Sequence, residues 1–139
     1  MTASVCIKAS NLDRLEILKW LKERDCPWNE EVCAEAAAGS LENLKWLREN
    51  GCPWDEKACE ATCTYGRLDI LMWARENGCS WNARVCEKAC LHSRLDILKW
   101  ARENGCAWDS MAFEAAWATG NEETMEYLRV NKCPGTEED

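Results

Sequence analysis

The sequence predicts an all-α fold, an α-solenoid of five stacked helix-turn-helix repeats. Three observations predict it. A large aromatic residue recurs in steps of 26, 27, 27 and 27 residues, at Trp20, Trp46, Trp73, Trp100 and Tyr127. Cysteines recur with the same steps, at Cys26, Cys52, Cys79, Cys106 and Cys133. Each repeat also contains two stretches with the apolar periodicity of an amphipathic helix. One such unit cannot bury its apolar face alone, so the copies must stack and share a core.

The first helix of each repeat, helix A, is predicted to begin after a polar residue that can cap a backbone N–H. The predicted caps are Thr2, Asn29, Asp55, Asn82 and Asp109, and the predicted ends are Asp13, Gly39, Gly66, Ser93 and Gly120. Three of these ends are glycines, which accept the left-handed conformation after a helix. Apolar residues follow the cap at the third, fourth, seventh and eighth positions, as in Val85, Cys86, Ala89 and Cys90. These residues are small, so a neighbouring helix can approach closely. Repeat two is one residue shorter just before Gly39, and we expect the end of its helix A to absorb the deletion.

The second helix, helix B, follows at once and is predicted to end at Gly51, Gly78 and Gly105 in repeats two to four. Its apolar arc is wide, which indicates packing against its own helix A and both neighbouring repeats. We expect the tryptophans of this helix, Trp20, Trp46, Trp73 and Trp100, to lie in the core. A second set, Trp28, Trp54, Trp81 and Trp108, precedes helix A and is predicted to pack the turn against it, with Arg side chains stacked on exposed rings.

The repeats cover about residues 1–27, 28–53, 54–80, 81–107 and 108–135 of a single predicted domain, with an acidic tail at 136–139. The last copy is more polar: Glu122 stands where the other copies have leucine. A polar outer face is what the terminal unit of a stack needs. The chain is either a complete short array or part of a longer one.

Charge limits the partners. The net charge of −8 has the wrong sign for binding a phosphate backbone, and it disfavours contact with anionic membranes. The sequence has no apolar run of about 18 residues, and its start lacks the apolar core of a signal peptide. We therefore expect a monomeric cytoplasmic protein that binds neither nucleic acid nor membrane.

The eleven cysteines do not predict a disulfide framework. Equivalent cysteines of neighbouring repeats would lie about 8 to 10 Å apart, whereas a disulfide needs Cα atoms within about 7 Å. We interpret them as small buried residues of a protein in a reducing, intracellular compartment. Two pairs spaced four apart, Cys59 with Cys63 and Cys86 with Cys90, have thiols on one helical face that could bind zinc. Other copies have Ser10, Ala37 and Trp117 at the position of Cys63 and Cys90. We therefore expect no metal and no cofactor.

The segment from Gly39 to Asp55 resembles the second helix and following turn of an ankyrin repeat, G-H-L-E-V-V-K-L-L-L-E-x-G-A-D-V-N. The matching residues are Gly39, Leu41, Glu42, Leu44, Lys45, Leu47, Glu49, Gly51 and Asp55, and the resemblance extends over all five repeats. The T-P-L-H tetrapeptide of the family is absent. The repeat is also about six residues short of the usual 33, at the place of the β-hairpin finger. The resemblance implies a fingerless variant of the ankyrin stack.

The sequence does not predict an enzyme, because it has a single histidine, His92, and no phosphate-binding glycine loop. Scaffold positions must repeat, whereas positions that contact a partner can differ between copies. The predicted function is therefore a protein-interaction module, with candidate partner-binding residues on helix A and the A–B turn: Glu31, Lys57, Tyr65, Arg84, Leu91, His92 and Met111. Two alternatives stay open, a thiol-based metal or redox protein and a structural spacer in a longer array.

Overall fold

The computed structural model describes residues 3–11 and 15–136, and every regular element in these ranges is an α-helix. The described helices are α1 (Ala3–Asn11), α2 (Leu15–Glu23), α3 (Glu30–Gly39), α4 (Leu41–Glu49), α5 (Glu56–Ala61), α6 (Leu68–Glu76), α7 (Ala83–Leu91), α8 (Leu95–Glu103), α9 (Ser110–Thr119) and α10 (Glu122–Val130). The all-α prediction is confirmed. The predicted cap Thr2 and the predicted helix end Asp13 lie outside the described residues.

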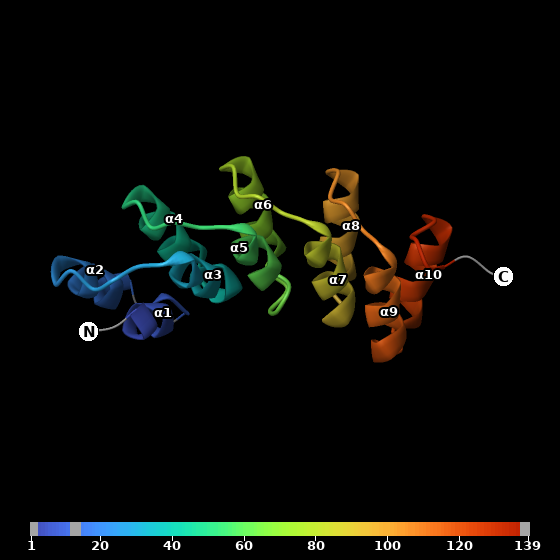
Figure 1. Ribbon diagram of the computed structural model, residues 1–139, viewed down its shortest axis with the longest axis horizontal. Helices are drawn as coiled ribbons and strands as arrows, with labels where there is room; N and C mark the ends of the chain where they lie inside the picture. Colours follow the sequence, from blue (N-terminus) through green and yellow to red (C-terminus); the bar gives the residue numbers. More distant parts are fainter. Residues whose placement is uncertain (1–2, 12–14, 137–139) are drawn as a thin grey trace. The chain divides into compact units, whose positions relative to one another are not determined.

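By contacts between residues, the chain divides into two compact units, residues 1–80 (unit 1) and 81–139 (unit 2). In unit 1, α3 packs against α1 on one side and α5 on the other, and α2, α4 and α6 pack against their own partners α1, α3 and α5. Figure 1 shows these helices as two layers, with α1, α3 and α5 below α2, α4 and α6. In unit 2, α9 packs against α7, while α8 packs on α7 and α10 on α9. We call α1, α3, α5, α7 and α9 the A helices, and the others the B helices.

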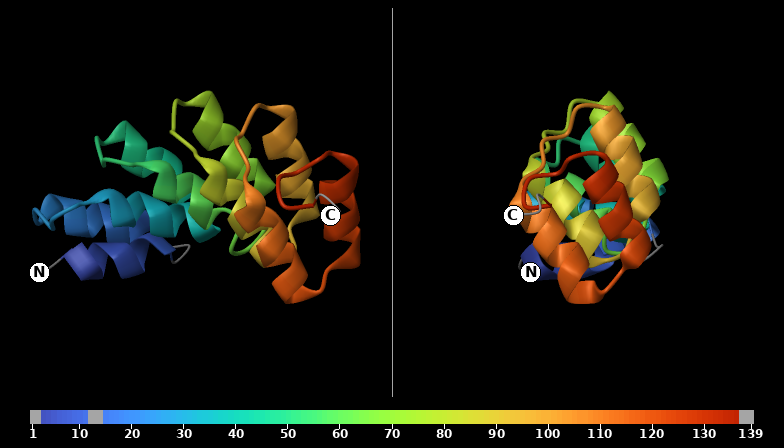
Figure 2. Two further views of the ribbon diagram at one scale, coloured as in Figure 1. Left: turned by 45° about the vertical axis from the view of Figure 1, so that its right-hand side comes forward. Right: turned by 90° about the vertical axis from the view of Figure 1, so that its right-hand side faces the viewer.

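An extended segment joins a B helix to the next A helix, at residues 26–29 and 52–55 in unit 1 and residues 106–109 in unit 2 (Figure 2). The turn before this segment contains a residue with positive φ, which is Asp25 (56°) after α2. After the next three B helices it is a glycine: Gly51 at 83°, Gly78 at 86° and Gly105 at 86°. The predicted ends of these B helices are confirmed. The residue after the glycine closes the turn, because the Cys52 N–H donates to the Leu47 carbonyl at 2.9 Å.

Four of the five predicted A-helix caps lie within the described residues, and all four are confirmed. In each, a side-chain oxygen of the cap accepts the backbone N–H two residues further on at 3.0 Å. The caps and the donating residues are Asn29 with Glu31, Asp55 with Lys57, Asn82 with Arg84, and Asp109 with Met111. Each bond satisfies one of the N–H groups that a helix start leaves without an intrahelical partner.

The ends of the A helices vary more than the sequence predicts. Only Ser40 separates α3 from α4, so the deletion in repeat two is absorbed at this helix end as predicted. Gly39 is therefore the last residue of α3 and does not adopt the left-handed conformation, unlike Gly66 (φ 69°) and Gly120 (φ 70°). Helix α5 ends at Ala61 rather than near Gly66. The Thr62 hydroxyl bonds the Cys59 carbonyl at 2.7 Å, a local bond that competes with the helical pattern.

The core of each unit is made of small side chains from A helices and larger ones from B helices. On α3, Val32, Cys33, Ala36 and Ala37 are fully buried, and Val85, Cys86, Ala89 and Cys90 of α7 are buried in the same way. The B helices contribute Leu44 and Leu47 in unit 1 and Ile97 and Leu98 in unit 2. Because the A-helix residues are small, α3 can lie close to α1 and α5, and α7 close to α9.

The tryptophans of the B helices lie less deeply than predicted. Trp20 is 48% exposed, and Trp46, Trp73 and Trp100 are half-buried. The last three rings stand edge-on to the ring of the tryptophan that begins the same repeat, with centroids 5.8, 5.9 and 5.7 Å apart. Each indole thus packs on the extended segment before helix A, at the margin of the core, in the edge-to-face arrangement that aromatic pairs favour.

The predicted stacking of arginines on the second set of tryptophans is confirmed in both units. The Arg48 guanidinium lies 4.4 Å from the ring centroid of Trp54, and that of Arg102 lies 4.1 Å from the centroid of Trp108. Arg48 also donates to the Cys52 carbonyl at 2.6 Å. The cation is therefore held between a ring face and the turn that ends its own helix.

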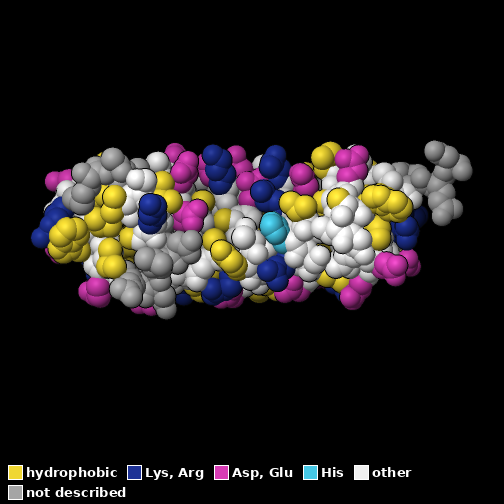
Figure 3. All heavy atoms as spheres, turned by 90° about the horizontal axis from the view of Figure 1, so that it is seen from below, with side chains coloured by type: hydrophobic (Ala, Val, Ile, Leu, Met, Phe, Trp, Pro, Cys, Tyr) yellow, Lys and Arg dark blue, Asp and Glu magenta, His cyan; other side chains and the backbone are white. Residues whose placement is uncertain are grey.

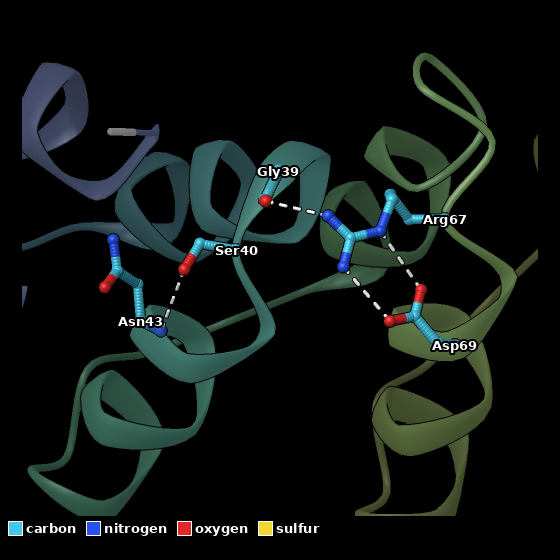
Figure 4. A network of polar contacts seen from close by, with 5 residues as sticks. All are labelled: Gly39, Ser40, Asn43, Arg67 and Asp69. Carbon is cyan, nitrogen blue, oxygen red and sulfur yellow. Dashed lines mark hydrogen bonds and ion pairs between the residues drawn. The ribbon is translucent and has the colours of Figure 1, made fainter. Parts of the chain in front are cut away.

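The start of the B helix is built in two ways in consecutive repeats (Figure 4). In α4, the Ser40 hydroxyl accepts the Asn43 N–H at 3.1 Å and caps the helix. At the same place before α6, Arg67 makes no cap bond; its guanidinium donates to the Gly39 carbonyl at 2.8 Å and to both Asp69 carboxylate oxygens at 3.1 and 3.0 Å. Arg67 therefore ties α6 to the end of α3 and holds the pKa of Asp69 below its usual range.

We predict that Asn82→Ala lowers the free energy of unfolding by about 1 kcal/mol, because the Arg84 N–H loses its acceptor. Urea denaturation followed by circular dichroism measures the change. The matched control is Asn82→Asp, since aspartate occupies this place at Asp55 and Asp109, and we expect its stability to stay within a few tenths of a kcal/mol of the parent. Equal stability of the alanine variant and the parent would contradict the role of this cap.

Candidate functional site

All seven candidate partner-binding residues are exposed. They form two groups. The first-turn group lies two residues after the cap of an A helix and comprises Glu31 and Lys57 in unit 1 and Arg84 and Met111 in unit 2. The helix-end group lies at or after the last residue of an A helix and comprises Tyr65 in unit 1 and Leu91 and His92 in unit 2.

The first-turn residues are held at a fixed place by their backbones. Each one donates its N–H to the cap side chain at 3.0 Å, while its own side chain reaches solvent. Glu31 and Lys57 occupy the same position on α3 and α5, which pack side by side, and Arg84 and Met111 do so on α7 and α9. Neighbouring helices are spaced by about 8 to 10 Å. The scaffold therefore presents side chains of different charge at a regular spacing.

The helix-end residues are equally exposed but are held in turns. Tyr65 lies in the turn of residues 62–66 after α5, and its side chain is 61% exposed. Leu91 is the last residue of α7 and is 46% exposed. The next residue, His92, closes that helix by donating its N–H to the Lys88 carbonyl at 2.9 Å. Aromatic and apolar side chains thus stand at the A–B turns.

The structure does not gather the seven residues into one cluster. Arg84 and Leu91 lie on the same helix seven residues apart, which corresponds to about 10 Å along its axis. In each unit the candidates instead lie at both ends of the A helices, with the first-turn group at the start and the helix-end group at or after the last residue. Figure 3 views this side and shows hydrophobic side chains interspersed with charged ones. A partner that contacts both groups must cover the length of an A helix.

Sequence reasoning missed a groove that recurs between neighbouring B helices. In unit 1, a groove of about 440 Å³ is lined by Lys45, Arg48, Glu49, Trp73 and Asn77. In unit 2, one of about 180 Å³ is lined by Arg102, Glu103, Trp108, Tyr127 and Asn131. Four of the lining positions are equivalent in the repeat, namely Arg48 and Arg102, Glu49 and Glu103, Trp73 and Tyr127, and Asn77 and Asn131. The 27-residue spacing of these residues was a signal for this groove, but helix pairing was needed to see it.

Sequence reasoning also missed an aromatic pair on α9, in which one ring is exposed. Trp117 is 66% exposed, and its ring centroid lies 6.4 Å from that of Phe113. The signal was present in the repeat alignment, because Phe113 and Trp117 stand where α7 has Cys86 and Cys90. Both cysteines are fully buried, so an indole at the second position is an exception to the repeat.

The cysteines are all buried, and their thiols pair differently from the pairs singled out in the sequence. The Cys33 thiol on α3 lies beside Cys52 in the turn after α4 and donates to the Cys52 carbonyl at 3.8 Å. Cys6 lies beside Cys26, Cys59 beside Cys79, and Cys86 beside Cys106 in the corresponding places. Each pair therefore joins an A helix to the turn that ends its own repeat. The spacing of four residues along one helix did not reveal this long-range pairing.

The pairs shift the pKa values of their two thiols in opposite directions. Hydrogen bonding with Cys33 lowers the pKa of Cys52, and hydrogen bonding with Cys59 lowers the pKa of Cys79. The hydrogen bond to Cys52, followed by burial, raises the pKa of Cys33, and the hydrogen bond to Cys106 with burial raises that of Cys86. Burial, with the Cys26 thiol beside it, raises the pKa of Cys6 to about 12. A thiol with a raised pKa stays protonated at neutral pH and is a weak nucleophile and metal ligand. Within the described ranges, no three His, Cys, Asp or Glu side chains are grouped as metal ligands would be.

The comparisons with known proteins do not identify a family for this chain. The sequence matches no protein-family model and no curated protein. In the part of the chain that the structure describes, no helix has the length and apolar character needed to cross a bilayer.

We predict that the thiols react slowly with an aromatic disulfide reagent in the native protein and that all eleven react at once in denaturant. Burial is the physical reason, since attack requires an exposed thiolate. The absorbance of the released thiol measures both rates. The denaturing condition is about 6 M guanidinium chloride, which lies above the roughly 5 M midpoint that marks a hyperstable domain. Rapid reaction of two or more thiols in the native protein would contradict the burial of the cysteines.

Proposed function

We propose that the chain is a protein-interaction module built as a solenoid of ankyrin-like helix pairs, which binds a protein partner through its A helices and A–B turns. The proposal rests on one observation: at the position two residues after the cap, the backbone is fixed in the same way in four repeats while the side chain differs. The backbone two residues after the cap is fixed by the same 3.0 Å hydrogen bond in α3, α5, α7 and α9, while the side chain there changes from Glu31 to Lys57, Arg84 and Met111. A repeated scaffold with variable exposed side chains is what a recognition surface requires.

The energetics favour binding by this kind of surface. The helices and caps fix the backbone before the partner arrives, so little ordering entropy is lost on association. Tyr65, which is 61% exposed, offers a large aromatic contact area, and Arg84 offers a cation; both residue types are enriched among interface hot spots. The remaining candidates, Glu31, Lys57, Leu91, His92 and Met111, supply charge and apolar area around them.

A thiol-based metal or redox function is the second candidate, and the four thiol pairs are the observation that favours it. Metal analysis of anaerobically purified protein, combined with thiol counting, separates it from the first. Bound zinc or copper in stoichiometric amount would support it. Protein that contains no metal and whose thiols react slowly would rule out the metal or redox function. A structural spacer in a longer array would show neither metal nor a partner.

We predict that changing Tyr65, Arg84 and His92 together to alanine removes partners from the set captured by the purified chain from an extract of the source cells. Quantitative mass spectrometry of pull-downs measures the loss, and about a tenfold drop in a specific partner is expected, because the aromatic and the cation carry most of the contact energy. The matched control is a triple alanine variant of exposed residues elsewhere, Glu23, Glu76 and Ser80. Identical partner sets for both variants and the parent would count against this surface.

A further inference from the structure

The outer face of the last described helix pair has its own composition. We call it the end face and define it by Phe113 and Trp117 of α9 and by Glu122, Met125, Glu126 and Arg129 of α10. These residues share one side of their helices, because they are spaced by three or four positions. A hollow of about 610 Å³ lies here. Every residue of the end face except Phe113 lines it, and so does Gly120. In the right-hand view of Figure 2, α9 and α10 are the foremost helices of unit 2.

The apolar part of the end face is an aromatic pair with an arginine beside it. The Phe113 and Trp117 rings lie 6.4 Å apart at an interplanar angle of 41°, and the Arg129 guanidinium lies 5.7 Å from the Phe113 centroid. Met125, which lines the hollow together with Trp117, is buried to all but 8%. Trp117, by contrast, leaves 66% of its surface in water. Covering this ring on binding would remove a large aromatic area from water.

The positions of Phe113 and Trp117 hold small residues on other A helices. A further A helix therefore cannot pack on α9 as closely as α5 packs on α3. Helix α3, which receives α5, has the fully buried Cys33 and Ala37 where α9 has Phe113 and Trp117. Helix α7, which receives α9, has the fully buried Cys86 and Cys90. An A helix packed on α9 at the same spacing would overlap the Trp117 indole, because close approach there depends on small side chains. The occupant must therefore accommodate an indole.

The polar part of the end face is acidic where the other repeats are not. Glu122 stands at the position of Leu41, Leu68 and Leu95, and Glu126 at the position of Lys45 and Lys99. Both carboxylates are exposed. Arg129 is the one basic residue lining the hollow in the described structure, and its guanidinium is directed at the Phe113 ring. The face therefore combines an exposed indole with two carboxylates, which favours a basic partner.

We propose that the end face binds a basic amphipathic helix of a partner protein. Its apolar side packs on Trp117 and over Met125, and Lys or Arg residues on its flank pair with Glu122 and Glu126. The lining residues of α10 run from 122 to 129, which is about 10 Å or two turns of helix. An added helix of three to four turns is therefore long enough to span the face. This is the helix-in-groove mode of recognition, with anchors spaced three and four residues apart.

The test uses the full chain and two synthetic helical peptides with the same leucine spacing, one with lysine and one with glutamate at the polar positions. Isothermal titration calorimetry measures their affinities. We expect the lysine peptide to bind and the glutamate peptide not to bind. Trp117→Ala should weaken the lysine peptide by about tenfold or more, and Glu126→Lys, which restores the residue found in other repeats, should do the same.

Two controls keep the result specific to the end face. Glu76→Lys changes the net charge as much as Glu126→Lys does, but at an exposed residue of α6 in unit 1, and should leave the affinity unchanged. The Tyr65, Arg84 and His92 triple variant should also bind the lysine peptide normally, so the end face is tested apart from the A-helix surface. Urea denaturation of each variant confirms that it is folded.

Three results would overturn the proposal. They are absence of binding of the lysine peptide to the parent, equal weakening by Glu76→Lys and Glu126→Lys, and unchanged affinity of the Trp117→Ala variant. Self-association of the parent in analytical ultracentrifugation that Trp117→Ala abolishes would also overturn it, because it would identify a second copy of the chain as the occupant.

Discussion

The close approach of neighbouring A helices is the constraint on which the rest of each unit depends. It requires small side chains where the helices meet, and Cys33, Ala36 and Ala37 of α3 meet this requirement, as do Ala89 and Cys90 of α7. With the A helices fixed, the B helices pack behind them and the extended segments bring each cap to the start of the next helix. Free cysteine suits these places because it behaves as a small hydrophobic residue. The abundance of cysteine is thus explained by packing.

The sequence predicted the features that depend on near neighbours. Caps such as Asn29 and Asp55 were correct because a cap bond joins residues two apart, and Gly51 marked a helix end because its φ is positive. Features set by distant contacts were predicted less well. The indole of Trp20 was placed in the core, but whether a ring on a wide apolar arc is covered depends on the next repeat. The thiol pairing between A helices and distant turns was missed for the same reason.

For the candidate surface, exposure was predictable and proximity was not. Variation between copies identified side chains that reach solvent, since a buried position must be filled alike in every repeat. Variation carries no information on distance, and the structure distributes Arg84 and Leu91 along opposite ends of one helix. The end face shows the complementary rule. Trp117 became informative only when its equivalents were seen to be buried, because an indole at a packing position changes what that helix can receive.

The most direct test of this account compares one substitution at two alanines. Ala89 is fully buried on α7, and Ala118 is exposed on α9. If small side chains set the helix spacing, Ala89→Leu lowers the free energy of unfolding by about 1 to 3 kcal/mol through overpacking, while Ala118→Leu changes it by less than about 0.5 kcal/mol. Urea denaturation measures both. Equal changes at the two positions would contradict close packing of the A helices as the basis of the fold.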